Sequence, residues 1–221
     1  MAGWSRQSAP DAQQLWASGA VAVEASGEGY VGHFAHGAEA PPDWAGPWMR
    51  KHRAVVCGRV AVAPSWVQAD AEVVLRIDPG VAFGNGAHPT TQLCLRALSR
   101  LVKPGMRVLD VGTGTGILAI AALKLGASYA LGTDIDDVAL QTAARLAKQH
   151  GVELRLAKKP RGKFDLIAAN LPLPAQRGLE RRLAPGGTLL SSGFMAHEQP
   201  LLPGRRTDFQ GWSLVEFNDS L

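Results

Sequence analysis

A glycine-rich turn between two apolar strands constrains this chain more than any other part of its 221 residues. The run RVLDV at 107–111 is short, apolar and rich in β-branched residues, as a buried parallel strand is. Gly112 opens the turn GTGTG, where glycine allows positive φ and a close approach of backbone to ligand. An apolar helical segment at 117–125 and a strand at 129–134 follow. This order predicts a nucleotide-binding βαβ unit.

Two acidic residues beside the turn narrow the choice of ligand. Asp110 precedes the turn on the first strand, and Asp134 lies 22 residues after Gly112, where such units hold ribose hydroxyls. The third glycine, Gly116, comes one residue earlier than in the GxGxxG dinucleotide fingerprint. GxGxG is typical of S-adenosylmethionine sites, whose ammonium group favours a carboxylate over a helix N-terminus. The alternative, a purely structural turn, explains the glycines but not both acidic residues.

Alternating strands and helices surround this unit and predict an α/β fold. We expect a Rossmann-like parallel sheet with helices on both faces, plus a small α+β N-terminal region. The expected helices are 89–102, 117–125, 137–149 and 173–183, and the expected strands are 107–111, 129–134, 153–156, 164–169, 187–192 and 212–217.

The chain divides into three sections. We expect residues 1–42 to form a small N-terminal region, residues 43–77 a linker of helix and strands, and residues 78–221 the domain that holds the βαβ unit. The elements expected in the first two sections are a helix at 11–17, a hairpin of 20–25 with 30–34, a helix at 43–52, and strand-like runs at 54–63 and 71–77.

Composition predicts a packed soluble core, since 46% of residues are apolar and 19% are charged. No apolar run approaches the ~20 residues that span a bilayer, and the N-terminus has no signal-peptide pattern. The two cysteines, Cys57 and Cys94, lack metal-ligand spacing and are interpreted as small buried residues. We therefore expect a cytoplasmic protein without a metal site or membrane contact.

The charged residues give a mild excess of positive charge. The net charge is +4, and basic residues cluster at 148–163 and 177–182. We interpret both clusters as solvated faces, because no aromatic residues interleave with the charges. No direct nucleic-acid binding is expected.

The loop that precedes the first domain helix is the second informative stretch. In IDPGVAFGNGAHPTTQLCLRAL, Phe83 is the single aromatic and could lie against a bound sulfonium. Pro89 falls in the first turn of the helix. His88 is equally well explained as a capping or core residue, and Thr91 as a helix cap or a ligand contact.

Together these stretches closely resemble the bacterial ribosomal protein L11 methyltransferases. IDPGVAFGNGAHPTTQLCL and LDVGTGTGILAIAALKLGA carry the resemblance, with DWAGPWMRKHRAVVCGRVAVAPSW upstream and FDLIAANLPLP and LAPGGTLLSSGF downstream. The similarity runs from Asp43 to about Phe194. It implies a class I S-adenosylmethionine-dependent protein methyltransferase that N-methylates lysine and/or N-terminal amino groups of ribosomal protein L11. Residues 78–221 would then be the methyltransferase domain, and residues 1–42 a reduced substrate-recognition region. We also expect a monomer.

The resemblance also implies a set of cofactor contacts, namely Thr91, Gly112, Gly114, Asp134 and Asn170. Asn170 ends a strand in A-A-N-L-P-L, where its side chain can orient the cofactor or the incoming amine. Its alternative role is that of a strand-end turn residue. No general base is evident, so no catalytic residue is assigned.

The chain departs from the family pattern in four places. The loop reads FGNGAH, so Asn85 and Ala87 replace two threonines, and residues 1–42 are long enough for about half of the family's ferredoxin-like domain. The segment 154–165 is short and basic beside the expected adenine site, and the last strand of the sheet is expected to be missing. These departures keep two alternatives open: methylation of another protein or small-molecule amine, and a non-catalytic cofactor-binding module. A nicotinamide dehydrogenase is the weakest option.

Overall fold

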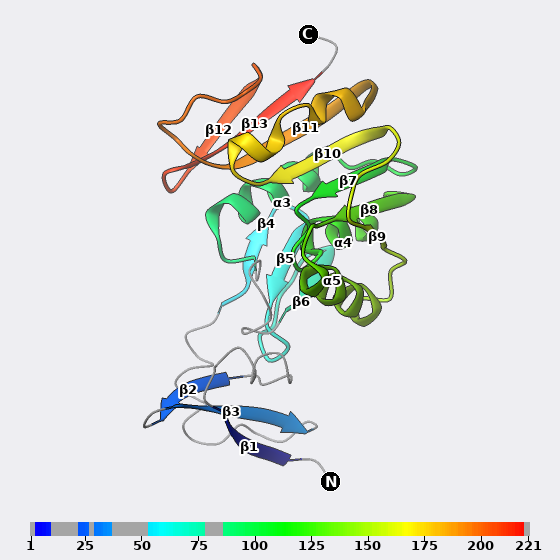
Figure 1. Cartoon of the computed structure of the whole chain (residues 1–221). Coiled ribbons are helices and arrows are strands. Elements are labelled where there is room, and N and C mark those ends of the chain that lie inside the picture. Colours follow the sequence, from blue (N-terminus) through cyan, green and yellow to red (C-terminus); the bar gives the residue numbers. More distant parts are fainter. Residues whose placement is uncertain (1–2, 10–21, 27–28, 37–52, 78–85, 219–221) are drawn as a thin grey trace.

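A seven-stranded sheet forms the centre of the structure, a computed structural model that describes residues 3–9, 22–26, 29–36, 53–77 and 86–218 (Figure 1). The strand order is β12-β13-β11-β10-β7-β8-β9. The five strands from β11 to β9 are parallel, and β13 is antiparallel to both of its neighbours. The strands are β7 (Arg107–Val111), β8 (Tyr129–Thr133), β9 (Arg155–Ala157), β10 (Phe164–Asn170), β11 (Leu183–Met195), β12 (Arg205–Phe209) and β13 (Trp212–Asn218).

The predicted βαβ unit is confirmed and lies at the centre of this sheet. β7 pairs with β8 on one side and with β10 on the other, so the strand order reverses between β7 and β10. In open parallel sheets a ligand binds outside the carboxyl ends of the strands at such a switch point. The topology therefore places the glycine-rich turn and Asn170 at one edge of the sheet.

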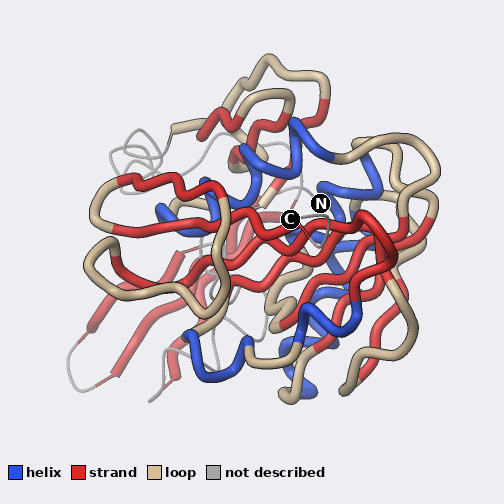
Figure 2. Tube along the Cα trace, turned by 90° about the horizontal axis from the view of Figure 1, so that it is seen from above, coloured by secondary structure: helices blue, strands red, loops and turns tan. Residues whose placement is uncertain are grey.

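Three α-helices cover one face of the sheet: α3 (Pro89–Leu101), α4 (Ile117–Lys124) and α5 (Asp137–Gln149). Their buried side chains share one apolar cluster with Val108, Leu166 and Leu190 of the sheet. All six residues from Ile117 to Ala122 are buried, because α4 lies between the sheet and its two helical neighbours. Figure 2 shows these helices beside the twisted strands.

The opposite face carries only short 3-10 helices among the described residues, η1 (Leu173–Gln176) and η2 (Leu179–Arg182). The expected single helix at 173–183 is therefore wrong. Prolines at 172 and 174 withhold backbone donors, and Gly178 takes the left-handed conformation at φ +80, so no continuous α-helix forms. The Rossmann-like fold is confirmed, with α-helices on one face and 3-10 helices on the other (Figure 1).

The sheet ends in a complete hairpin, so the expectation of a missing strand is wrong. β12 and β13 pair through Gln210 and Gly211, whose φ angles of +50 and +79 suit a tight hairpin turn. The sequence pattern did not predict β12, because RRTDF is mostly charged and mostly exposed, as an edge strand is. β13 is an interior strand, paired on both sides.

Two small three-stranded sheets precede the large one. β1 (Gly3–Ala9), β2 (Ala22–Ser26) and β3 (Gly29–His36) pair in the order β1-β3-β2, which confirms the predicted hairpin and adds an unpredicted strand. β4 (Val55–Cys57) and β5 (Val60–Ala63) form a second hairpin, and β6 (Val73–Arg76) lies parallel to β5. The helices expected at 11–17 and 43–52 lie outside the described residues.

The two cysteines are buried, as predicted. Burial raises the pKa of the Cys94 thiol to about 12 and also raises the pKa of the Cys57 thiol, so neither is a nucleophile at neutral pH. Among the helices of the described segments, none combines the length and the apolar content that crossing a bilayer requires.

Replacing Leu214 by alanine tests whether β13 is an interior strand. Leu214 is 1% exposed and packs in the cluster that α3–α5 form with the sheet, so Leu214→Ala is expected to lower the free energy of unfolding by about 2–5 kcal/mol. Urea unfolding measures this loss. Leu201→Ala, at a 41% exposed loop position, serves as the control. Equal midpoints for the two variants would contradict the assignment.

Candidate functional site

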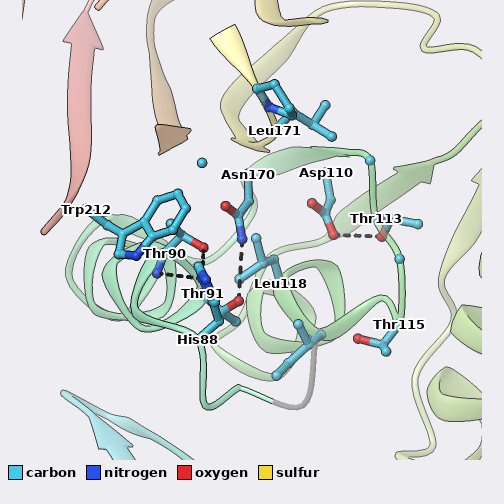
Figure 3. Close-up of a pocket in the computed structure, with 15 residues that line it drawn as sticks. His88, Thr90, Thr91, Asp110, Thr113, Thr115, Leu118, Asn170, Leu171 and Trp212 are labelled. Carbon is cyan, nitrogen blue, oxygen red and sulfur yellow. Dashed lines mark hydrogen bonds between the residues drawn. The ribbon is translucent and has the colours of Figure 1, made fainter. Parts of the chain in front are cut away.

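A cavity of ≈ 360 Å³ opens at the carboxyl edge of the sheet, where β7 and β10 end (Figure 3). Its walls come from the start of α3, the glycine-rich turn, the N-terminal turn of α4, the segment after β10, and β11 and β13. The volume falls within the range of small-molecule sites. The site thus occupies the position that the topology predicts.

The glycine-rich turn is fixed from behind by backbone hydrogen bonds. The amides of Gly112 and Thr113 both donate to the Thr133 carbonyl, at 2.8 and 2.9 Å. Gly112 has φ +69, and a Cβ there would come within 2.4 Å of the Leu171 side chain. Glycine is required at 112 both by its backbone conformation and by the segment packed against it.

Asp110 is the buried acid of the site, with 1% of its surface exposed. Its Oδ2 accepts a hydrogen bond from the Thr113 hydroxyl at 2.7 Å and one from the Ala119 amide at 3.3 Å. The N-cap of α4 is Gly116, which has no capping side chain, so Asp110 supplies an acceptor for an amide in the first turn of the helix. Burial raises the pKa of the Asp110 carboxyl to about 6, although both hydrogen bonds act in the opposite direction.

Asn170 and Thr91 meet across the cavity. The Asn170 amide nitrogen lies 3.4 Å from the Thr91 hydroxyl oxygen, to which it donates. Thr91 is 3% exposed and lies in the first turn of α3, whereas Asn170 is the last residue of β10 (Figure 3). The segment after Asn170 is held by Gln176, whose amide donates to the carbonyls of Leu171 and Ser192 at 2.5 and 2.8 Å.

An aromatic residue and a histidine form one wall of the cavity. The rings of His88 and Trp212 meet edge to face, with centroids 4.8 Å apart. His88 is also the N-cap of α3, because its Nδ1 accepts from the Thr90 amide at 3.4 Å. The interpretation of His88 as a capping residue is therefore confirmed, whereas its side chain is only half-buried and is not a core residue. Sequence reasoning missed Trp212, since nothing near it in the chain marks the start of β13 as part of a site.

Asp134 lies beside the cavity and not among the residues that line it. Its Oδ2 accepts from the Gly114 amide at 3.0 Å, and its Oδ1 accepts from the Asp136 amide at 3.1 Å. The structure therefore brings together four of the predicted residues, Thr91, Gly112, Gly114 and Asn170, and links Asp134 to them through the turn. Other residues of the cavity wall are Thr113, Thr115, Leu118 and Gly193.

Two expectations about the surroundings of the cavity have different outcomes. Phe83 lies outside the described residues, so its expected contact with a bound sulfonium stays a prediction, and Asn85 also lies outside them. The basic segment 154–165 contributes no residue to the cavity wall. It lines a separate groove on the sheet, so it does not alter the charge of this cavity.

The wall of the cavity favours a ligand with an ammonium group over one with a pyrophosphate. Of the described residues that line it, none is lysine or arginine, and Asp110 is the one carboxylate. A buried carboxylate is stabilised by a cationic partner, whereas an anionic diphosphate would be repelled by it. The donor set fits S-adenosylmethionine.

Comparison with known families and proteins agrees with this geometry. The model of the family described as "Ribosomal protein L11 methyltransferase (PrmA)" matches residues 11–220. A ribosomal protein L11 methyltransferase from Symbiobacterium thermophilum is 42% identical over 179 residues, which cover 75% of this chain and 59% of that protein. The one from Caldicellulosiruptor bescii is 41% identical over 165 residues, covering 69% and 54%. The chain therefore spans little more than half the length of these relatives.

Solved structures show the same fold. The crystal structure of a ribosomal protein L11 methylase from Lactobacillus delbrueckii subsp. bulgaricus aligns with a TM-score of 0.65 at 31% identity, covering 75% of this chain and 97% of that one. A 16S rRNA methyltransferase from Thermus thermophilus aligns with a TM-score of 0.51 at 19% identity, covering 89% and 57%. The second similarity shows the fold alone.

Asp110→Asn is expected to remove a pH dependence of stability. The pKa of the Asp110 carboxyl is 3.8 in the unfolded chain and about 6 in the folded protein, so the folded state binds the proton more tightly between these two pH values. Wild-type stability therefore falls as pH rises through this window, by up to roughly 3 kcal/mol relative to the variant, and the difference is constant above it. Urea unfolding of both proteins between about pH 4 and 7 measures the difference. Parallel pH profiles would show that Asp110 does not titrate as described.

Proposed function

The chain belongs to the ribosomal protein L11 methyltransferase (PrmA) family, and we propose that it is an S-adenosylmethionine-dependent enzyme that N-methylates lysine and/or N-terminal amino groups of ribosomal protein L11. The observation that supports this most is the cavity at the switch point, which combines one buried carboxylate with a strand-end asparagine. Family membership alone gives the reaction class, whereas the site gives named groups that can perform it.

The proposed cofactor contacts follow from the wall of the cavity. Asp110 would accept from the ammonium group, and the turn at Gly112 and Gly114 would lie along the amino-acid part of the cofactor. Asp134 uses both of its oxygens for backbone amides, and each oxygen retains a lone pair that can accept from a ribose hydroxyl. When bound, the cofactor supplies a methyl group on a cationic sulfur.

The amine has to enter as a neutral nucleophile, because its lone pair forms the new bond to carbon while the carbon–sulfur bond breaks. A lysine amine has a pKa of about 10.4 in water, so the site must favour its neutral form or remove a proton. Asn170 donates through its amide nitrogen to Thr91, which leaves the Asn170 carbonyl oxygen free to accept from the amine N–H. Thr91 thereby sets the orientation of Asn170.

The wall formed by His88 and Trp212 would border the path of the incoming side chain. Trp212 presents an apolar surface on which the methylene stem of a lysine can pack. This arrangement positions the amine for an in-line approach, and positioning is the main contribution that the protein makes to a transfer of this kind.

The N-terminal section is proposed to select the substrate. Residues 1–42 would form a reduced recognition region, with the β1–β3 sheet as its framework, and residues 43–77 would connect it to the methyltransferase domain at 78–221. We propose that the enzyme is cytoplasmic, since its proposed substrate is a ribosomal protein. We also propose that it acts as a monomer. The limited coverage of the full-length relatives favours one second candidate, methylation of another protein amine.

Calorimetric titration with S-adenosylmethionine, with NADH as the control ligand, tests the cofactor first. Micromolar binding of S-adenosylmethionine alone supports the proposal. Incubation with ribosomal protein L11 and with unrelated basic proteins, followed by mass spectrometry of the products, then separates the two substrate candidates. Absence of binding to either ligand would contradict a cofactor site in this cavity.

Asn170→Ala is expected to lower kcat/KM for methylation by about 100-fold, because the amine loses the group that orients it. S-Adenosylmethionine affinity should change less than tenfold, since Asp110 and the turn remain. Initial rates and calorimetry measure the two quantities. Asn218→Ala is the matched control, because Asn218 ends β13 and bonds to Thr188 away from the cavity. Equal rates for both variants would contradict the role of Asn170.

A further inference from the structure

The sheet face opposite α3–α5 carries a groove of ≈ 530 Å³ beside the edge strand β9. Tyr129, Leu131 and Ala157 form its floor, and they belong to the apolar cluster of this face. Its rim consists of four exposed cations, Arg155, Lys158, Lys159 and Arg161. We refer to these residues as the basic groove.

The cations of the basic groove are available to an external partner. Arg155 pairs with Glu153 at 2.6 Å and Lys158 with Asp137 at 2.8 Å, but both pairs are largely exposed and exposed pairs contribute little. Within the described segments the structure gives Lys159 and Arg161 neither an ion pair nor a side-chain hydrogen bond. The groove wall contains no acidic residue.

More cations continue this surface along the same face. The Lys163 ammonium donates to the carbonyl of Arg181 in η2 at 2.8 Å, which links the loop after β9 to the 3-10 helices. Arg177 and Arg181 are exposed there. The fold therefore gathers on one face the cations of 155–163 and those of 177–182, two stretches that are separate in the sequence.

The floor of the basic groove is apolar, but two of its side chains are partly covered. Leu131 is 6% exposed, and the Arg107 guanidinium lies 4.2 Å from the centre of the Tyr129 ring and covers it. An amphipathic partner segment needs exposed apolar pockets, whereas a polyanion needs exposed cations. The surface matches a polyanion.

We propose that the basic groove and the adjoining η2 cations bind the phosphate backbone of RNA. The choice of RNA among polyanions rests on the proposed function, because a ribosomal protein substrate is assembled with RNA. Backbone contacts of this kind are independent of sequence and depend strongly on salt. The proposal departs from the sequence-based expectation of no nucleic-acid contact, which rested on the lack of aromatic residues among the charges.

Fluorescence anisotropy with a labelled RNA hairpin of about 16 base pairs tests the proposal on the full chain without cofactor. The double variant Lys159→Glu/Arg161→Glu is expected to weaken binding more than about tenfold at about 100 mM salt and to reduce the salt slope by about two. The matched control is Arg145→Glu/Lys148→Glu, two exposed cations of α5 on the opposite face.

Three results would overturn the proposal: unchanged binding by the groove variant, equal losses in both variants, and stronger wild-type binding to poly-glutamate than to RNA. The last result would indicate an acidic protein partner. Methylation of free ribosomal protein L11, measured separately, should differ less than about twofold between wild type and groove variant. If wild type binds RNA through the groove but does not methylate this protein, the proposed function fails and the RNA surface stands.

Discussion

The buried carboxylate of Asp110 is the interaction on which the site depends. One oxygen atom joins the end of β7 to the glycine-rich turn through Thr113 and to the start of α4 through Ala119. The N-cap of α4 is a glycine, which has no capping side chain. Asp110, which favours a cationic ligand, therefore also fixes the helix that forms part of the cavity wall. Burial makes this charge costly without a cation, and ligand binding would relieve that cost.

The rest of the site is held in place before any ligand arrives. Thr133 anchors the turn from β8, Thr91 orients Asn170, and Gln176 fixes the segment after β10. These groups come from distant parts of the chain, but each is attached to the end of a strand or the start of a helix. Such preorganisation is what a transfer reaction requires, because the cofactor carries the reactivity and the protein supplies geometry.

Sequence patterns predicted the parts of the fold that depend on local chemistry. The βαβ unit follows from glycine conformation and strand composition, and four of the five expected cofactor residues line one cavity. The misses have tertiary causes. Prolines and Gly178 interrupt an apparent helix, β12 is a charged edge strand, and Trp212 reaches the cavity only because β13 lies antiparallel beside β11. No local pattern specifies that placement.

The two faces of the large sheet are covered unequally, and they differ in the side chains that they carry. The face packed against α3–α5 gives the rigid support on which the cavity is built, and its clusters are apolar. The other face has only short 3-10 helices and loops, so long basic side chains from β9, its following loop and η2 extend over it to solvent. None of the described residues that line the cavity belongs to η2 or to the loop after β9. Selection can therefore change the charge of the second face without disturbing the chemistry of the first.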